Sequence, residues 1–133
     1  MYVIDFIKKW FLTIIALIVF AWLTLAPDPL PDNDVGMWFE GVDKVVHGLM
    51  LWGVTCAVTF DYIRSNRRVT LRVAAIMFAW LIALSAADEL AQSAMNIGRT
   101  GDALDLIADL IGIIVGLLTG PPITIRILSL RKK

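Results

Sequence analysis

Four long apolar stretches dominate this chain of 133 residues and restrict the folds that it can adopt. They run over residues 10–26, 45–60, 71–87 and 104–119. Each reaches the length needed to cross a bilayer, roughly 20 residues, once its flanks join the helix. Four segments are too few to close a β-barrel, so spanning segments here must be helical. The sequence therefore predicts an all-α fold, a bundle of four transmembrane helices at about residues 6–26, 43–63, 69–92 and 102–120.

The composition fits a single membrane domain over residues 1–133. Hydrophobic residues make up 59% of the chain, which is above the usual apolar share of soluble domains, and the length suits one compact unit. Cys56 is the only cysteine in the sequence, which excludes an intrachain disulfide. The basic residues are scattered at helix ends and form no groove or known binding motif, so we expect no nucleic-acid partner.

The charged residues predict how the helices are oriented. Ten of the twelve Lys and Arg residues fall at the two ends of the chain and around the 63–68 loop, and only Lys44 and Arg99 fall on the other side. The acids show the reverse distribution. Because Lys and Arg are retained on the cytoplasmic side of a membrane, we expect both termini in the cytoplasm. The 27–41 loop and the 88–101 region then face outward.

The fourth span carries a polar face that continues into a glycine stripe. The residues within about 80° of one another on this helix are Asp102, Asp105, Asp109, Gly112, Gly116 and Gly120. Small residues at this spacing let a neighbouring helix approach closely, so the aspartates above them should also face the bundle. Asp109 lies two turns inside the helix, where an ionisable group indicates a functional site. Asp102 alternatively serves as a helix cap, and Pro121-Pro122 is expected to end the span.

Two further helix ends should meet this face near the outer surface of the membrane. The third span ends with Ser85, Asp88, Glu89 and Gln92, and the second begins with Asp43, Lys44 and His47. Antiparallel neighbours with short loops place these ends at one depth, and Arg99 lies in the connecting loop. The alternatives are structural: Asp43 as a cap, His47 as a packing residue, and Glu89, Gln92 and Arg99 as an ion-pair clip.

These residues, taken in order, resemble the VanZ-like family of small bacterial membrane proteins. The resemblance lies in D-K-V-V-H (Asp43, Lys44, His47), D-E-L-A-Q (Glu89, Gln92), G-R-T-G-D-A-L-D (Gly98, Arg99, Asp102, Asp105) and D-L-I-G-I-I-V-G (Asp109, Gly112, Gly116). It covers residues 43–120, and Asp109 stands where the family pattern has asparagine. The resemblance implies a multi-pass protein of the bacterial cytoplasmic membrane, in a family whose founding member is associated with teicoplanin resistance.

The leading functional hypothesis is a site that binds or processes an anionic envelope lipid or lipid-linked cell-wall precursor. Lys44 and Arg99 would contact phosphate, and the polar groups around them would hold the rest of the headgroup. The candidate binding residues are Asp43, Lys44, Asp88, Gln92, Arg99, Asp102 and Asp109. Membrane lipids are the expected partners, and the sequence does not give the oligomeric state.

Two other functions stay open. In the first, the protein is an intramembrane hydrolase or transferase that uses His47, Glu89 and Asp105 for acid–base catalysis. A metal-assisted version would use His47, Glu89 and Asp109, but one histidine without an H-E-x-x-H motif is a weak signal, and we assign no cofactor. In the second, the polar groups clip the helices together or dock a membrane partner.

Overall fold

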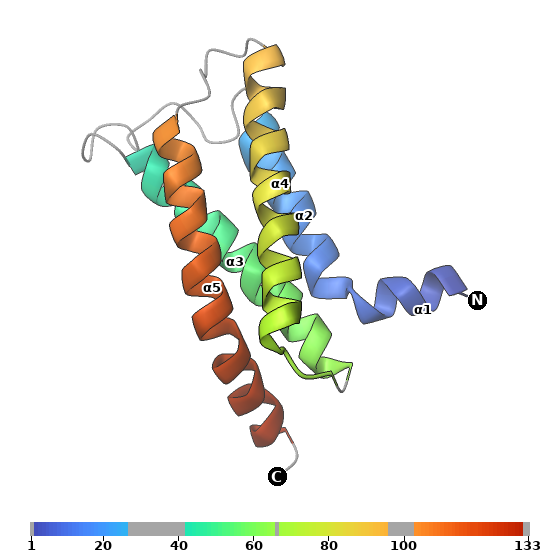
Figure 1. Ribbon diagram of the computed structural model, residues 1–133. Coiled ribbons are helices and arrows are strands. Elements are labelled where there is room, and N and C mark those ends of the chain that lie inside the picture. The colour runs from blue at the N-terminus through green and yellow to red at the C-terminus, as the bar shows by residue number, and fades with distance from the viewer. Residues whose placement is uncertain (1, 27–41, 66, 96–102, 132–133) are drawn as a thin grey trace.

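The computed structural model describes residues 2–26, 42–65, 67–95 and 103–131, and every regular element in these ranges is a helix (Figure 1). The helices are α1 (Tyr2–Lys9), α2 (Phe11–Leu25), α3 (Val42–Arg64), α4 (Leu71–Met95) and α5 (Ala103–Leu130). This confirms the all-α prediction for the described ranges. In these ranges α3, α4 and α5 are long and apolar enough to cross a membrane, whereas α2 is a shorter apolar helix of 15 residues.

Helices α2 to α5 pack as a ring around a small apolar core. The most extensive contact joins α3 to α5, and further contacts join α2 to α3, α4 to α5 and α2 to α4. Helices α3 and α4 are therefore diagonal partners across the bundle. The buried hydrophobic residues are Phe20, Leu51, Val54, Val58, Met77, Leu81 and Ile113. This core lies toward the middle of the helices, which leaves the ends of the bundle for polar groups.

The glycine stripe of α5 faces α3, as the sequence predicts. A Cβ atom at Gly112 would overlap the backbone carbonyl of Gly48 on α3. One at Gly116 would lie 2.5 Å from the Cβ atom of Thr55, which is closer than atoms can pack. Because glycine has no side chain, the backbones of α3 and α5 can approach closely at these positions. This close contact fixes α5 against α3.

The first predicted span, at residues 6–26, is divided in the structure into α1 and α2, with the break at Trp10. The buried Asp61 carboxylate of α3 accepts hydrogen bonds from the Thr13 backbone N–H (2.8 Å) and from the Thr13 hydroxyl (2.9 Å). The Thr13 N–H lies in the first turn of α2, where backbone donors lack partners within the helix and favour an anion. Arg64 donates to the carbonyl groups of Lys8 and Lys9 at the end of α1. These contacts stabilise a helix end at a point where the apolar sequence alone predicts a continuous helix.

The last helix also differs from its predicted range of 102–120. Pro121 and Pro122 lie inside α5, which continues to Leu130. Each proline removes one backbone N–H donor, but such losses are tolerated in membrane helices where neighbouring groups compensate. The carbonyl groups that lose a donor are those four residues earlier, of Leu117 and Leu118. The prediction that Pro121 and Pro122 end the helix is wrong.

The two ends of the bundle carry different groups. Helix α1, the start of α4 and the end of α5 lie at one end, and the starts of α3 and α5 lie with the end of α4 at the other (Figure 1). Arg67, Arg68, Arg72 and Arg126 belong to the first end and are exposed. The second end holds the predicted polar site.

Candidate functional site

Five of the predicted site residues lie buried at the second end of the bundle, where α3, α4 and α5 meet. Their exposed fractions are 6% for His47, 8% for Asp88, 2% for Gln92, 7% for Asp105 and 1% for Asp109. Burial of polar and charged side chains is costly unless they find partners. Their partners therefore show how the site is built.

His47 and Asp109 face each other across the contact between α3 and α5. The His47 Nδ1 atom lies 3.6 Å from the Asp109 Oδ1 atom, and the Gly48–Gly112 contact beside them holds the two helices at this separation. The Ser85 hydroxyl of α4 donates to the other carboxylate oxygen, Asp109 Oδ2, at 2.6 Å. The Asp109 carboxylate is thus oriented by α4 so that its Oδ1 atom points at the imidazole.

Glu89 of α4 completes this group, which we call the polar cluster: His47, Glu89 and Asp109. One potential ligand atom from each of these side chains lies within 4.8 Å of the other two. In the described ranges, both carboxylate oxygens of Glu89 are inaccessible to solvent and accept no hydrogen bond. The polar cluster brings three of the predicted residues from three helices to one point, and their chemical roles stay predictions.

Lys44 and Asp105 form the outer border of the polar cluster. The Lys44 ammonium lies 3.6 Å from the Asp105 Oδ1 atom, and the lysine side chain is 30% exposed whereas that of Asp105 is 11% exposed. Asp105 is also close enough to interact electrostatically with His47. A cation therefore lies at the rim of the site and carboxylates lie below it.

Asp88 and Gln92 contact a different helix from the polar cluster. The Thr24 hydroxyl of α2 donates to Asp88 Oδ1 (2.7 Å), and the Gln92 amide donates to Asp88 Oδ2 (2.8 Å). Both carboxylate oxygens therefore have a hydrogen-bond donor, which is the usual state of a buried polar group. This arrangement clips α2 to α4. Thr24 lies in an apolar run with no polar neighbour, so no pattern in the sequence marks it as a partner of Asp88.

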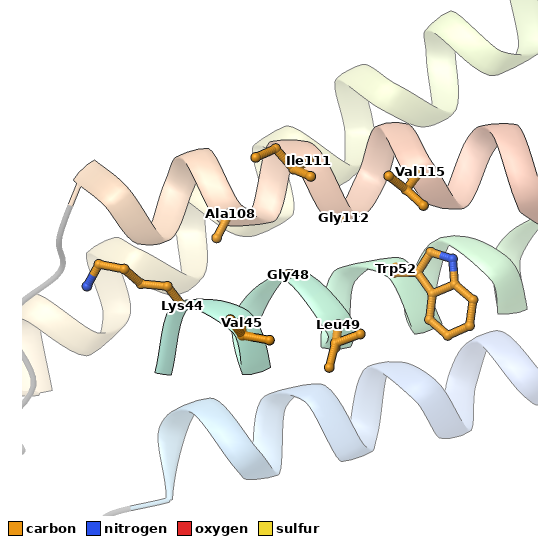
Figure 2. Close-up of a pocket in the computed structure, with 9 residues that line it drawn as sticks. All are labelled: Lys44, Val45, Gly48, Leu49, Trp52, Ala108, Ile111, Gly112 and Val115. Atoms are coloured by element: carbon orange, nitrogen blue, oxygen red, sulfur yellow. The ribbon is translucent and has the colours of Figure 1, made fainter. Parts of the chain in front are cut away.

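A groove of about 450 Å³ opens beside the site, between α3 and α5. Its walls are apolar side chains from both helices, with Lys44 near one end and Trp52 at the other (Figure 2). The close approach of Gly48 and Gly112 forms part of the lining. The Trp52 indole N–H donates to the Thr119 hydroxyl (2.9 Å), and this hydrogen bond fixes the ring at its end of the groove. No pattern in the sequence predicts this groove, because its walls come from two helices that are far apart along the chain.

Three predicted binding groups cannot be placed. Arg99 and Asp102 lie outside the described residues, as does the side chain of Asp43, whose backbone belongs to α3. The binding and catalytic roles of all the site residues remain predictions, whether or not the structure describes their side chains.

Comparison with known proteins identifies the family. A family model described as VanZ/LLP1 matches residues 5–124, which is most of the chain. No curated protein and no solved structure matched the chain in the corresponding searches. The match includes the polar cluster, the glycine stripe, all of α3 and α4, and α5 as far as residue 124. The chain therefore belongs to the VanZ/LLP1 family and is a VanZ-like membrane protein.

Proposed function

We propose that this protein binds an anionic lipid, or a lipid-linked cell-wall precursor, at the outer leaflet of the bacterial cytoplasmic membrane. The hydrocarbon chain of the lipid lies in the groove between α3 and α5, and the phosphate of its headgroup lies at Lys44. The groove carries this proposal, because it combines an apolar cavity with a cation at one end. That combination matches an amphiphile with a negative headgroup.

The dimensions of the groove support an acyl or polyprenyl chain as the occupant. Lys44 and Trp52 are eight residues apart on α3, which corresponds to about 12 Å along a helix. The volume of about 450 Å³ falls within the range of roughly 300–1,000 Å³ for small-molecule sites. Val45 and Ile111 in its walls are 50% and 58% exposed. The groove is therefore accessible from the side, where a lipid in the bilayer would enter.

The proposal includes four membrane crossings with both termini in the cytoplasm. Helix α2 is short, but Thr13 near its start contacts Asp61 at the end of α3, and Thr24 near its end contacts Asp88 beside the site. These contacts support a crossing by α2 from one end of the bundle to the other. The concentration of Lys and Arg at the end opposite the site supports a cytoplasmic location for that end.

Blocking the groove tests the proposal. Val115 lines the groove, and Ile114, the residue before it, lies about 100° away around α5. Val115 is 42% exposed and Ile114 is 46% exposed. We expect Val115→Trp to fill the groove and reduce lipid binding at least tenfold, with Ile114→Trp as the matched control that binds normally. Native mass spectrometry of the detergent-solubilised protein, titrated with phosphatidylglycerol or a polyprenyl phosphate, measures this binding.

The two lipids distinguish the class of ligand, and a charge variant tests the headgroup contact. Lys44→Gln should weaken the binding of both anionic lipids but leave the weaker binding of phosphatidylcholine unchanged. Preference for the polyprenyl phosphate over phosphatidylglycerol would support a lipid-linked precursor as the ligand. Equal binding of anionic and neutral lipids by the wild-type protein would refute the proposal, as would unchanged binding in Val115→Trp.

A contribution to teicoplanin resistance is also part of the proposal, and it follows from the family rather than from the groove. Expression in a susceptible Gram-positive host should raise the inhibitory concentration of teicoplanin, and Val115→Trp at equal abundance should abolish the increase. An unchanged inhibitory concentration with the wild-type protein present in the membrane would contradict this part of the proposal alone.

A further inference from the structure

The polar cluster has the composition and geometry of a metal site. His47, Glu89 and Asp109 come from α3, α4 and α5 respectively, and one ligand atom from each lies within 4.8 Å of the other two. The potential ligands are one imidazole nitrogen and two carboxylate oxygens. Three side chains of these types that converge from three helices resemble a site with three protein ligands and an open coordination position.

The separation between His47 and Asp109 fits two ligands of one ion better than a direct hydrogen bond. The Nδ1–Oδ1 distance of 3.6 Å exceeds the usual limit of about 3.2 Å for an N–H···O hydrogen bond. Two ligands bound at about 2.0–2.1 Å to a tetrahedral ion lie roughly 3.3 Å apart. An inward movement of the three side chains, whose ligand atoms lie within 4.8 Å of one another, would bring all three into bonding distance of one ion.

The cluster also contains more buried, unpartnered atoms than a structural clip would leave. In the described ranges, His47 Nδ1, Asp109 Oδ1 and both carboxylate oxygens of Glu89 are inaccessible to solvent and make no hydrogen bond. His47 is 6% exposed and Asp109 is 1% exposed. Buried polar atoms are normally partnered, as at Asp88 only one position before Glu89. One cation would give all these side chains a partner.

The surroundings hold the cluster in the state that a metal needs. The hydrogen bond from Ser85 occupies Asp109 Oδ2 and leaves Oδ1 directed at His47, as supporting groups do for metal-binding carboxylates. The ion pair with Lys44 draws Asp105 toward the rim. The two carboxylates of Glu89 and Asp109 then balance the charge of a divalent ion.

We propose that His47, Glu89 and Asp109 bind one divalent transition-metal ion, Zn²⁺ or Mn²⁺. An imidazole ligand favours these ions over Mg²⁺ and Ca²⁺, which prefer oxygen ligands alone. The metal site lies on the α4 side of the contact between α3 and α5. It goes beyond lipid binding and does not depend on it.

The test measures metal binding directly, in detergent and without added lipid. The purified protein is loaded with Zn²⁺ or Mn²⁺, dialysed, and analysed for metal per chain, and its thermal unfolding is followed with and without the ion. We expect about one ion per chain and a higher melting temperature with the metal. His47→Gln and Glu89→Gln should each reduce the metal content to less than a tenth of the wild-type value.

Asp88→Asn provides the matched control, because Asp88 is a buried carboxylate next to Glu89 whose oxygens are bound by Thr24 and Gln92. It should retain the ion. The wild-type measurement alone can overturn the proposal, even if a variant fails to fold: no bound ion and no change in melting temperature would do so. A bound ion that persists unchanged in both His47→Gln and Glu89→Gln would also overturn it.

Discussion

Gly112 lies where α5 comes closest to α3, and its position leaves no room for a side chain. Gly112→Ala would place a methyl group on the backbone of Gly48, so one helix must move. We expect a loss of about 1–3 kcal/mol in the free energy of unfolding, the usual cost of overpacking. Gly53 on α3 is the control: a Cβ atom added there would meet no neighbouring atom within 4 Å in the described ranges. Thermal unfolding in detergent should show Gly53→Ala at least as stable as wild type; equal effects of both changes would contradict this explanation.

The Asp61 carboxylate of α3 is the anion that lies at the start of α2. Its carboxylate accepts two hydrogen bonds from Thr13 and has Arg64 3.4 Å away. In Asp61→Asn, an uncharged amide replaces the carboxylate. The NH₂ group of this amide cannot pair with the Arg64 guanidinium. We expect a loss of about 1.5–3 kcal/mol, typical of a hydrogen bond to a charged group. Urea or thermal unfolding measures the loss, with exposed Asp5→Asn as the control that should change stability by less than about 0.5 kcal/mol.

At the scale of the helices, α1 has the character of a segment that lies along a membrane surface. Its apolar residues gather on one side, and all its described side chains are exposed except the half-buried Lys9. Figure 1 shows α1 leaving the bundle at an angle to α2. A helix with an apolar face and a charged face lies in the plane of the interface. We therefore expect Ile7 to face the acyl chains and Lys8 to face water.

Spin labels at positions 7 and 8 in a liposome-reconstituted protein check this orientation. The label at position 7 should be more accessible to oxygen, which concentrates in the bilayer, and the label at position 8 to a water-soluble nickel chelate. Equal accessibility of the two labels to both agents would show that α1 does not lie at the interface. The native Cys56 is replaced by alanine for this measurement, since it is the only cysteine in the sequence.

The same helices show how far the sequence could predict the fold and the site. Apolar length located α3 and α4 closely, and spacing on one helix correctly grouped Asp109 with Gly112 and Gly116, because these patterns are local. The break at Trp10 depends on Asp61, which is 48 residues from Thr13. The partner of Asp88 is 64 residues away on α2. Such contacts follow from the order of helices around the bundle, which no single-helix pattern contains.

For the molecule as a whole, the two proposed sites share one border. Lys44 is the cation at the end of the groove, and it pairs with Asp105 beside the polar cluster. In the described part of this border, three carboxylates lie near the one lysine: those of Glu89, Asp105 and Asp109. Their negative charge disfavours the binding of an anionic headgroup. A divalent ion would offset the charges of two carboxylates. Metal binding should therefore strengthen the binding of an anionic lipid.

This coupling has a reciprocal form that makes it testable from both sides. If Zn²⁺ or Mn²⁺ raises the affinity for a polyprenyl phosphate by some factor, the lipid must raise the affinity for the metal by the same factor. We expect at least tenfold, which corresponds to about 1.4 kcal/mol of coupling. Lipid titrations with and without metal, and metal titrations with and without lipid, give the two factors independently. The coupling should disappear in Glu89→Gln, which lacks a metal ligand, and persist in Asp88→Asn, whose carboxamide lies outside the cluster. If metal and lipid each bind but neither affects the other, the headgroup does not lie beside the polar cluster, and the shared border at Lys44 and Asp105 has no role in recognition.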